Sequence, residues 1–151
     1  METINEFKDK AKVAYLKFAQ AKEALEEVFG KKTFLNIMDR VQSFEDACQE
    51  TGRDPKDPYF SACRPHENAI RKWEVVCEAL NEGVVLSYAN GRQEKWHVYL
   101  IYEGSCFRFH VVAYTLTHSY TGLGSRLGLC SEKLARHAAK YFLPLIIETV
   151  S

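Results

Sequence analysis

His97 and His110 are the residues whose types and spacing best suit acid–base chemistry or metal binding. Both fall in apolar, β-branched segments joined by Gly104-Ser105, a two-residue turn typical of a β-hairpin. In the register that this turn sets, they are diagonal neighbours on the more polar face, with His110 opposite Tyr99. Such a pair could bind a metal or provide a general base. We favour the more ordinary role, which is hydrogen bonding to water or to a covering helix.

A second candidate for metal binding is the C-x-x-H pattern of Cys63 and His66, with Cys77 further along the same predicted helix. A zinc site of the tetrahedral kind needs four ligands. Because the fourth would have to come from elsewhere in the chain, we favour a loop cysteine and a first-turn histidine. No cofactor is expected.

Nucleophilic and phosphate-binding motifs are weak in this chain. There is no G-x-S-x-G pattern, and the stretch 122–126 resembles a phosphate-cradling loop without the lysine that a P-loop requires. We interpret Gly122 and Gly124 as turn formers that let the chain re-enter the sheet. A non-catalytic protein is therefore favoured, and a small enzyme using His97 or His110 is the alternative.

The connection from Tyr114 to Arg126 is the best candidate for a binding surface. Tyrosine and arginine are enriched at the energetic centres of protein interfaces, and here they stand among threonines and serines. The predicted contact residues are Tyr114, His118, Tyr120 and Arg126. These residues predict a protein partner, although a connecting loop that binds nothing is an open alternative.

Charge argues against nucleic acid as the main partner. The chain has 20 basic and 20 acidic residues and a formal net charge of zero, whereas nucleic-acid binding draws most of its affinity from phosphate neutralisation. Nucleic-acid binding stays an alternative through the basic residues Arg92, Lys95 and Arg108, if these cluster on one face. Near-zero net charge also removes a barrier to self-association, so a homo-oligomer is open.

Cysteine usage and hydropathy indicate the compartment. The 5 cysteines are odd in number and irregularly spaced, which is not a disulfide framework. The N-terminal segment is charged rather than an apolar leader, and no apolar stretch approaches the roughly 20 residues that span a bilayer. We therefore expect a cytoplasmic protein without a membrane partner.

The hydrophobic periodicity predicts a single α+β domain over residues 1–151, with helices packed around a short antiparallel β-meander of three to four strands. Residues 1–83 are mainly helical, 84–130 form the meander and 131–151 form a C-terminal helix. The first helix, Thr3–Phe29, places apolar residues at alternating three- and four-residue steps. That repeat resembles a coiled-coil seam, and we favour its packing on the chain's own domain over a dimer seam.

The hairpin register follows from the apolar pattern. Pairing Glu103 with Cys106 places one apolar set on a single face, and a one-residue slip would destroy the match. That face is predicted to hold Trp96, Val98, Leu100, Tyr102, Phe107, Phe109, Val111 and Ala113. Two further strands are expected, at Val84–Tyr88 and at Arg126–Cys130.

Several phrases occur in an order that resembles a family of small uncharacterised proteins of Bacteroides-group bacteria, their prophages and their phages. The phrases are Ser43-Phe44-Glu45-Asp46-Ala47-Cys48, Ala79-Leu80-Asn81-Glu82-Gly83, Gly124-Ser125-Arg126-Leu127, Ser131-Glu132-Lys133-Leu134-Ala135 and Ala139-Lys140-Tyr141-Phe142. The chain departs from the family pattern at Val84–Tyr88 and at Leu129-Cys130, where aromatic residues are usual.

The resemblance implies a setting and no activity. It suggests a phage, prophage or mobile-element accessory or structural protein, made in the cytoplasm of a bacterial cell or carried in the virion. Combined with the Tyr114–Arg126 connection, it leads us to expect a non-catalytic interaction protein with a host or phage partner.

Overall fold

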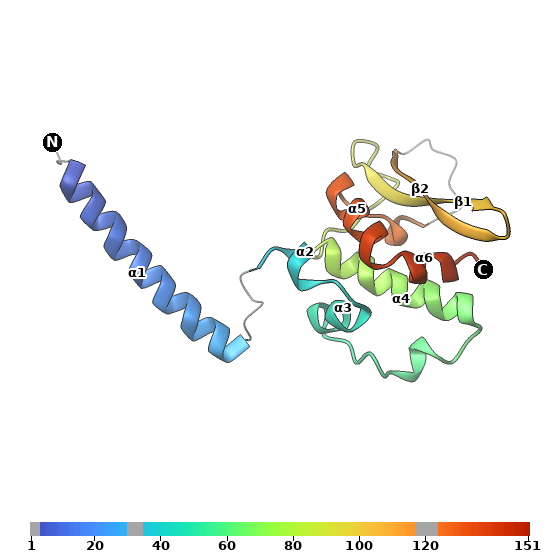
Figure 1. The fold of residues 1–151 in the computed structure, drawn as a ribbon, viewed down its shortest axis with the longest axis horizontal. Coiled ribbons are helices and arrows are strands. Elements are labelled where there is room, and N and C mark those ends of the chain that lie inside the picture. Colours follow the sequence, from blue (N-terminus) through green and yellow to red (C-terminus); the bar gives the residue numbers. More distant parts are fainter. Residues whose placement is uncertain (1–3, 30–34, 117–123) are drawn as a thin grey trace. The chain divides into compact units, whose positions relative to one another are not determined.

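A computed structural model of the chain describes residues 4–29, 35–116 and 124–151 (Figure 1). The chain forms two compact units, Met1–Arg40 and Val41–Ser151. None of the helices in the described ranges combines the length and the apolar character needed to cross a bilayer.

The first unit contains the helices α1 (Ile4–Phe29) and α2 (Ile37–Arg40). The predicted first helix is confirmed over residues 4–29, while its expected first residue, Thr3, lies outside the described residues. The apolar residues that α1 places between positions 8 and 28 are exposed, including Phe18 and Leu25. Whether this helix packs on the chain's own domain stays a prediction.

Six helical elements of the described residues belong to the second unit. They are α3 (Phe44–Thr51), the 3₁₀ turn η1 (Pro58–Phe60), α4 (Pro65–Leu80), the 3₁₀ turn η2 (Ser125–Leu127), α5 (Glu132–Tyr141) and α6 (Leu143–Glu148). Ser43 caps the start of α3, since its Oγ accepts a hydrogen bond from the Asp46 N–H at 3.1 Å. Gly52 ends this helix in the left-handed region, with a φ of 68°.

The core of the second unit draws on all of its layers. Its fully buried residues include Val41, Val76 of α4, Leu129, and Ala135 and Ala138 of α5. α4 contacts α3 and α6, and α5 contacts both strands of the sheet. Figure 1 shows the β-hairpin lying across one side of these helices, so the α+β class is confirmed.

The sheet of the described residues has two antiparallel strands, β1 (Lys95–Glu103) and β2 (Cys106–Thr115). The predicted pairing of Glu103 with Cys106 is confirmed. Gly104 and Ser105 both adopt positive φ, at 62° and 99°, as a tight hairpin turn of the primed type requires.

A β-bulge changes the register halfway along the hairpin. Tyr99 pairs with Val111 but Leu100 pairs with Phe109, so His110 is the extra residue. The predicted apolar face is therefore wrong beyond this point. Val112, paired with Val98, and Tyr114, paired with Trp96, take the places that were expected for Val111 and Ala113.

The expected meander of three to four strands is wrong. Val84–Tyr88 forms a loop, because the Gln93 side chain takes the hydrogen bonds that a neighbouring strand would supply. Its Oε1 accepts from the Ser87 N–H at 2.8 Å, and its Nε2 donates to the Val85 carbonyl at 3.1 Å.

The last expected strand, Arg126–Cys130, shrinks to a single bridge. Residues Ser125–Leu127 form the 3₁₀ turn η2, and only Leu129 pairs with Trp96, through two hydrogen bonds of 2.8 Å. On the other side, the buried Asn81 amide donates to the Gly128 carbonyl at 3.0 Å and accepts from the Cys130 N–H at 2.8 Å. The Asn81 side chain thus makes the backbone hydrogen bonds that a neighbouring strand would otherwise make.

Candidate interaction surface

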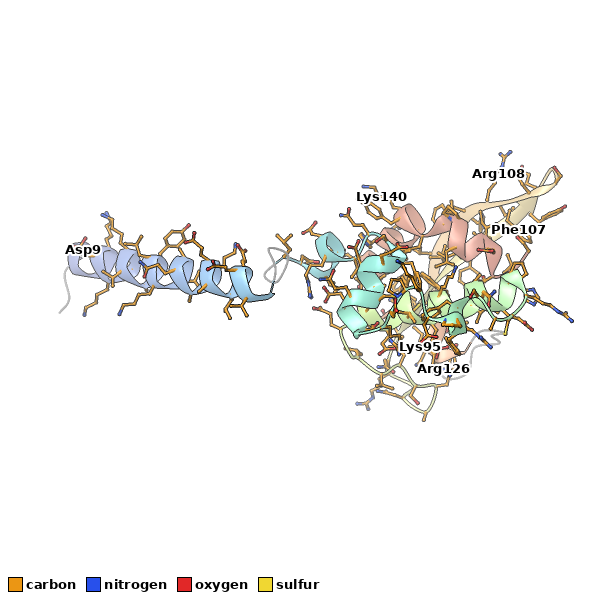
Figure 2. The ribbon with its side chains drawn as sticks, turned by 90° about the horizontal axis from the view of Figure 1, so that it is seen from below. Asp9, Lys95, Phe107, Arg108, Arg126 and Lys140 are labelled. Atoms are coloured by element: carbon orange, nitrogen blue, oxygen red, sulfur yellow. The ribbon has the colours of Figure 1, made fainter. Side chains whose placement is uncertain are left out.

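The half of the hairpin beyond the bulge exposes large apolar side chains. Tyr102 is 65% exposed and Ile101 43% exposed, on opposite faces of β1. Figure 2 shows Phe107 and Arg108 on the part of β2 that projects from the rest of the unit. Exposed apolar residues gathered in this way are typical of interaction sites. We call this projecting part, residues 99–111, the hairpin tip.

The outer edge of β1 offers hydrogen-bonding groups that lack a strand partner. Trp96 turns its N–H and C=O outward to Leu129. In an antiparallel ladder the outward groups alternate, so those of Val98, Leu100 and Tyr102 point the same way. Within the described part of the chain, no backbone hydrogen bond beyond the hairpin is made by these three residues. Among residues 4–29, 35–116 and 124–151, nothing pairs with this edge beyond Leu129.

An apolar cavity of about 340 Å³ lies between the hairpin and the helices α4 and α6. From the hairpin side, Val98, Leu100 and Phe107 line it. The opposite wall is made by Ile70, Trp73, Ile146, Thr149 and Val150, and Leu127 closes one end. The open edge of β1 and this cavity share Val98 and Leu100, so a chain paired with the edge could place a side chain in the cavity.

His97 is a buried residue that also lines the cavity described above. It is 2% exposed, its Nε2 lies 3.4 Å from the Thr115 hydroxyl, and its Nδ1 makes no hydrogen bond in the described structure. Burial lowers the pKa of His97, and the Leu127 backbone partly opposes this. The ring closes against Gly128, where a Cβ would come within 3.2 Å of its Cε1.

The expected placement of His97 and His110 as diagonal neighbours on one face of the hairpin is wrong. His110 occupies the bulge and is exposed, whereas His97 lies in the regular part of the ladder and is buried. Val111, rather than His110, stands opposite Tyr99. A shared metal or proton-transfer site of these two histidines is therefore not formed.

The cysteine candidates are used in packing. Cys77 is fully buried, and burial, together with Glu74, raises the pKa of its thiol well above the ordinary value. Cys63 is held through its backbone by the Asn68 amide, at 3.0 and 2.8 Å. All five cysteines are free thiols. Among the described residues, no group of three or more histidine, cysteine or acidic side chains is placed to hold a metal, and His66 joins none.

The two described residues of the predicted binding loop lie in different settings. Tyr114 is 48% exposed, and its ring packs on Trp96 with centroids 5.1 Å apart. The Arg126 side chain pairs with Glu74 at 3.1 Å, in a groove of about 150 Å³ that Tyr114 does not line. His118 and Tyr120 lie outside the described residues. The loop as a binding site stays a prediction.

The basic residues that could serve nucleic acid do not form a patch. Lys95 is fully buried, and its Nζ donates to the carbonyls of Gln93 at 2.5 Å and Asn90 at 3.1 Å. Arg108 lies 3.9 Å from Glu103 on the hairpin. Because Lys95 ties down the loop before β1, it is unavailable to phosphate groups.

Comparison with known protein families, with curated proteins and with solved structures finds no match for this chain. The features that point to a function are the geometry of the hairpin, its open edge and the cavity beside it. Sequence reasoning missed this edge, because it expected a meander of three to four strands with further strands at Val84–Tyr88 and Arg126–Cys130. The signal that could have found it is Gly128 followed closely by the helix cap Ser131, which leaves room for very few paired residues.

Proposed function

We propose that this chain is a non-catalytic interaction protein that binds an extended segment of a partner protein along the outer edge of β1. The observation that carries the proposal is the juxtaposition of an open strand edge with an apolar cavity. Val98 and Leu100 belong to both. Strand addition of this kind takes affinity from backbone hydrogen bonds and specificity from pockets for alternate side chains.

The Leu129 bridge supports this mode of binding. It shows that the edge of β1 accepts an antiparallel neighbour, with two hydrogen bonds of 2.8 Å at Trp96. Next to Leu129 the chain forms η2 and no longer pairs with β1. The outward backbone N–H and C=O groups of Val98, Leu100 and Tyr102 could therefore bind another chain. A bound segment would extend the line that Leu129 begins.

The lining of the cavity indicates which side chains the bound segment should carry. Its walls are mainly apolar, with Trp73 and Ile146 on the helical side and Phe107 on the hairpin side. Side chains of a strand alternate between faces, so the segment should carry apolar residues at alternate positions. The exposed apolar residues of the hairpin tip would extend the contact beyond the cavity.

The experiment is a selection of short displayed peptides on the immobilised full-length protein. We expect enriched peptides with apolar residues at alternate positions. Tyr102→Pro should weaken their binding by about fivefold, because proline removes one outward N–H and a hydrogen bond contributes roughly 1 kcal/mol. Tyr102→Val is the matched control, since it removes the ring but keeps the N–H.

A second pair of variants tests the cavity. Ile70 lines it from α4 and is 36% exposed, so Ile70→Trp should fill the space and abolish binding, whereas Ile70→Leu should preserve it. Thermal unfolding of each variant checks that the fold is retained. Peptides without alternation, or binding that survives both Tyr102→Pro and Ile70→Trp, would contradict the proposal.

The biological setting is proposed from the family resemblance alone. We propose a phage, prophage or mobile-element accessory or structural protein, acting in the bacterial cytoplasm or in the virion. The position of its gene beside virion, regulatory or defence genes tests this setting. A gene in a housekeeping operon, with no mobile-element neighbours, would speak against it.

A further inference from the structure

The helix α1 carries an apolar seam that repeats every seven residues. Within the helix, the seam positions alternate in steps of three and four without interruption. They are Ile4, Phe7, Ala11, Ala14, Phe18, Ala21, Leu25 and Val28. Phe18 is 59% exposed, Leu25 41% and Val28 73%. A sustained repeat of this kind is the seam of a two-helix coiled coil, and we call it the α1 seam.

Four of the seven positions that flank the α1 seam within the helix are lysines, and the other three are Tyr15, Ala24 and Phe29. In the seven-residue repeat, the two flanking positions carry Lys8, Lys10, Lys17 and Lys22, and no flanking position is acidic. The acidic residues of α1 lie further round the helix. One of them, Glu26, pairs with Lys22 at 3.5 Å along the helix.

This charge pattern disfavours a second copy of the chain as the partner. In a parallel pair, the flanking Lys17 would face Lys22 of the second copy, and in an antiparallel pair it would face Lys17 of that copy. Like charges at these positions destabilise a coiled coil and select against the pairing. A parallel pair would also set alanine against alanine at Ala11, Ala14 and Ala21, which buries little apolar area.

We infer that α1 docks an amphipathic helix of another protein whose seam carries larger apolar residues and whose flanking positions are acidic. Larger apolar side chains would fill the space above the three alanines of the α1 seam, and acidic flanks would pair with its four lysines. An anionic lipid surface fits less well, because Glu23, Glu26 and Glu27 concentrate negative charge in the last turns of the helix. This inference is independent of the binding proposed for the hairpin, and it replaces the packing of α1 on the chain's own domain that the sequence alone led us to favour.

The test uses the full-length protein and two synthetic helical peptides, each about four heptads long. Both peptides have leucine at the seam positions. One has glutamate at every flanking position, and the matched control has lysine there. Titration calorimetry at low salt should show the glutamate peptide binding at least about tenfold tighter than the lysine peptide, with the difference shrinking at high salt.

A charge-swapped variant sharpens the test. Lys8→Glu, Lys10→Glu, Lys17→Glu and Lys22→Glu together should reverse the preference, so that the lysine peptide binds tighter. Tyr102→Pro should leave peptide binding to α1 unchanged, which separates this inference from the hairpin proposal.

Three results would overturn the inference. The first is equal binding, or no binding, of the two peptides. The second is a dimer of the wild-type chain that dissociates when Phe18 is changed to Glu, because the partner would then be a second copy. The third is binding of the wild-type chain to phosphatidylserine-containing vesicles together with failure to bind the glutamate peptide.

Discussion

At the scale of single residues, Asn81 shows how one amide can take the place of a β-strand. It is 6% exposed and links the end of α4 to the segment before α5, through Gly128 and Cys130. Both of its hydrogen bonds go to backbone groups. Without the amide, these groups would have to find water or remain unpaired, which costs roughly 1–3 kcal/mol per group when they are buried.

We therefore expect Asn81→Ala to lower the free energy of unfolding by about 2–4 kcal/mol, since it removes both hydrogen bonds and leaves two backbone groups without partners. Urea unfolding followed by circular dichroism measures this. Ser87→Ala, in the loop before β1, is a control for which we expect a change of about 0.5 kcal/mol or less. Equal losses in both variants would show that Asn81 has no special role.

His97 makes the stability of the fold depend on pH. A histidine in an unfolded chain has a pKa of about 6.5, and burial lowers the pKa of His97 in the folded protein. At pH values well above about 6.5, His97 is neutral in both the folded and the unfolded chain, so its protonation does not reduce the free energy of unfolding. As the pH falls below that value, the unfolded chain takes up a proton that the folded protein resists, so the free energy of unfolding decreases.

The His97→Gln variant should lack this component, so its free energy of unfolding should fall less than that of the wild type between roughly pH 7 and pH 5. Denaturant unfolding across this range compares the two slopes. Parallel pH profiles would mean that His97 has the same proton affinity in the folded and unfolded chains.

At the scale of elements, one part of the hairpin can be predicted from the sequence and another part cannot. The turn at Gly104-Ser105 and the pairing of Glu103 with Cys106 follow from turn chemistry and apolar alternation, which are local properties. The bulge at His110 does not, because both registers place apolar side chains on each face. The helix α5 contacts both strands and α6 contacts β2, and such packing is a tertiary property that the local pattern does not contain.

Two expected strands, Val84–Tyr88 and Arg126–Cys130, do not form, and the reason is again a contact that the local sequence pattern does not contain. Val84–Tyr88 has the β-branched and aromatic composition of a strand, but the side chain of Gln93 occupies its hydrogen-bonding groups. Lys95 likewise looks like a surface cation in the sequence and is buried by the loop that it holds. Such side-chain to backbone contacts depend on the folded loop, so composition alone cannot predict them.

The hairpin turn also supports a prediction about stability. Ser105 adopts a φ of 99°, a left-handed conformation that costs a non-glycine residue roughly 1–2 kcal/mol. Ser105→Gly should therefore stabilise the protein by about 0.5–1 kcal/mol, after allowing for the greater freedom of glycine in the unfolded chain. Thermal unfolding should show a higher midpoint. The neighbouring change Gly104→Val should lower it, because Gly104 also has a positive φ, of 62°.

At the scale of the whole molecule, the two units carry separate binding proposals. The second unit contains its own core, with Val41, Leu80, Leu129, Ala135 and Ala138 almost completely buried. A unit with such a core can fold alone. An isolated helix such as α1, in contrast, is marginal in water and gains most of its stability from what it packs against. The two proposals therefore predict different consequences of removing α1.

A chain that lacks residues 1–34 should fold cooperatively, with a free energy of unfolding within about 1 kcal/mol of the full chain. It should keep the binding of alternating apolar peptides, because the β1 edge and the cavity lie within Val41–Ser151. It should lose the binding of the acidic helical peptide, because the α1 seam is gone. Denaturant unfolding and titration with both peptides measure these outcomes. An unfolded truncated chain would show that α1 packs on the core, and retained binding of the acidic peptide would place that binding elsewhere than on α1.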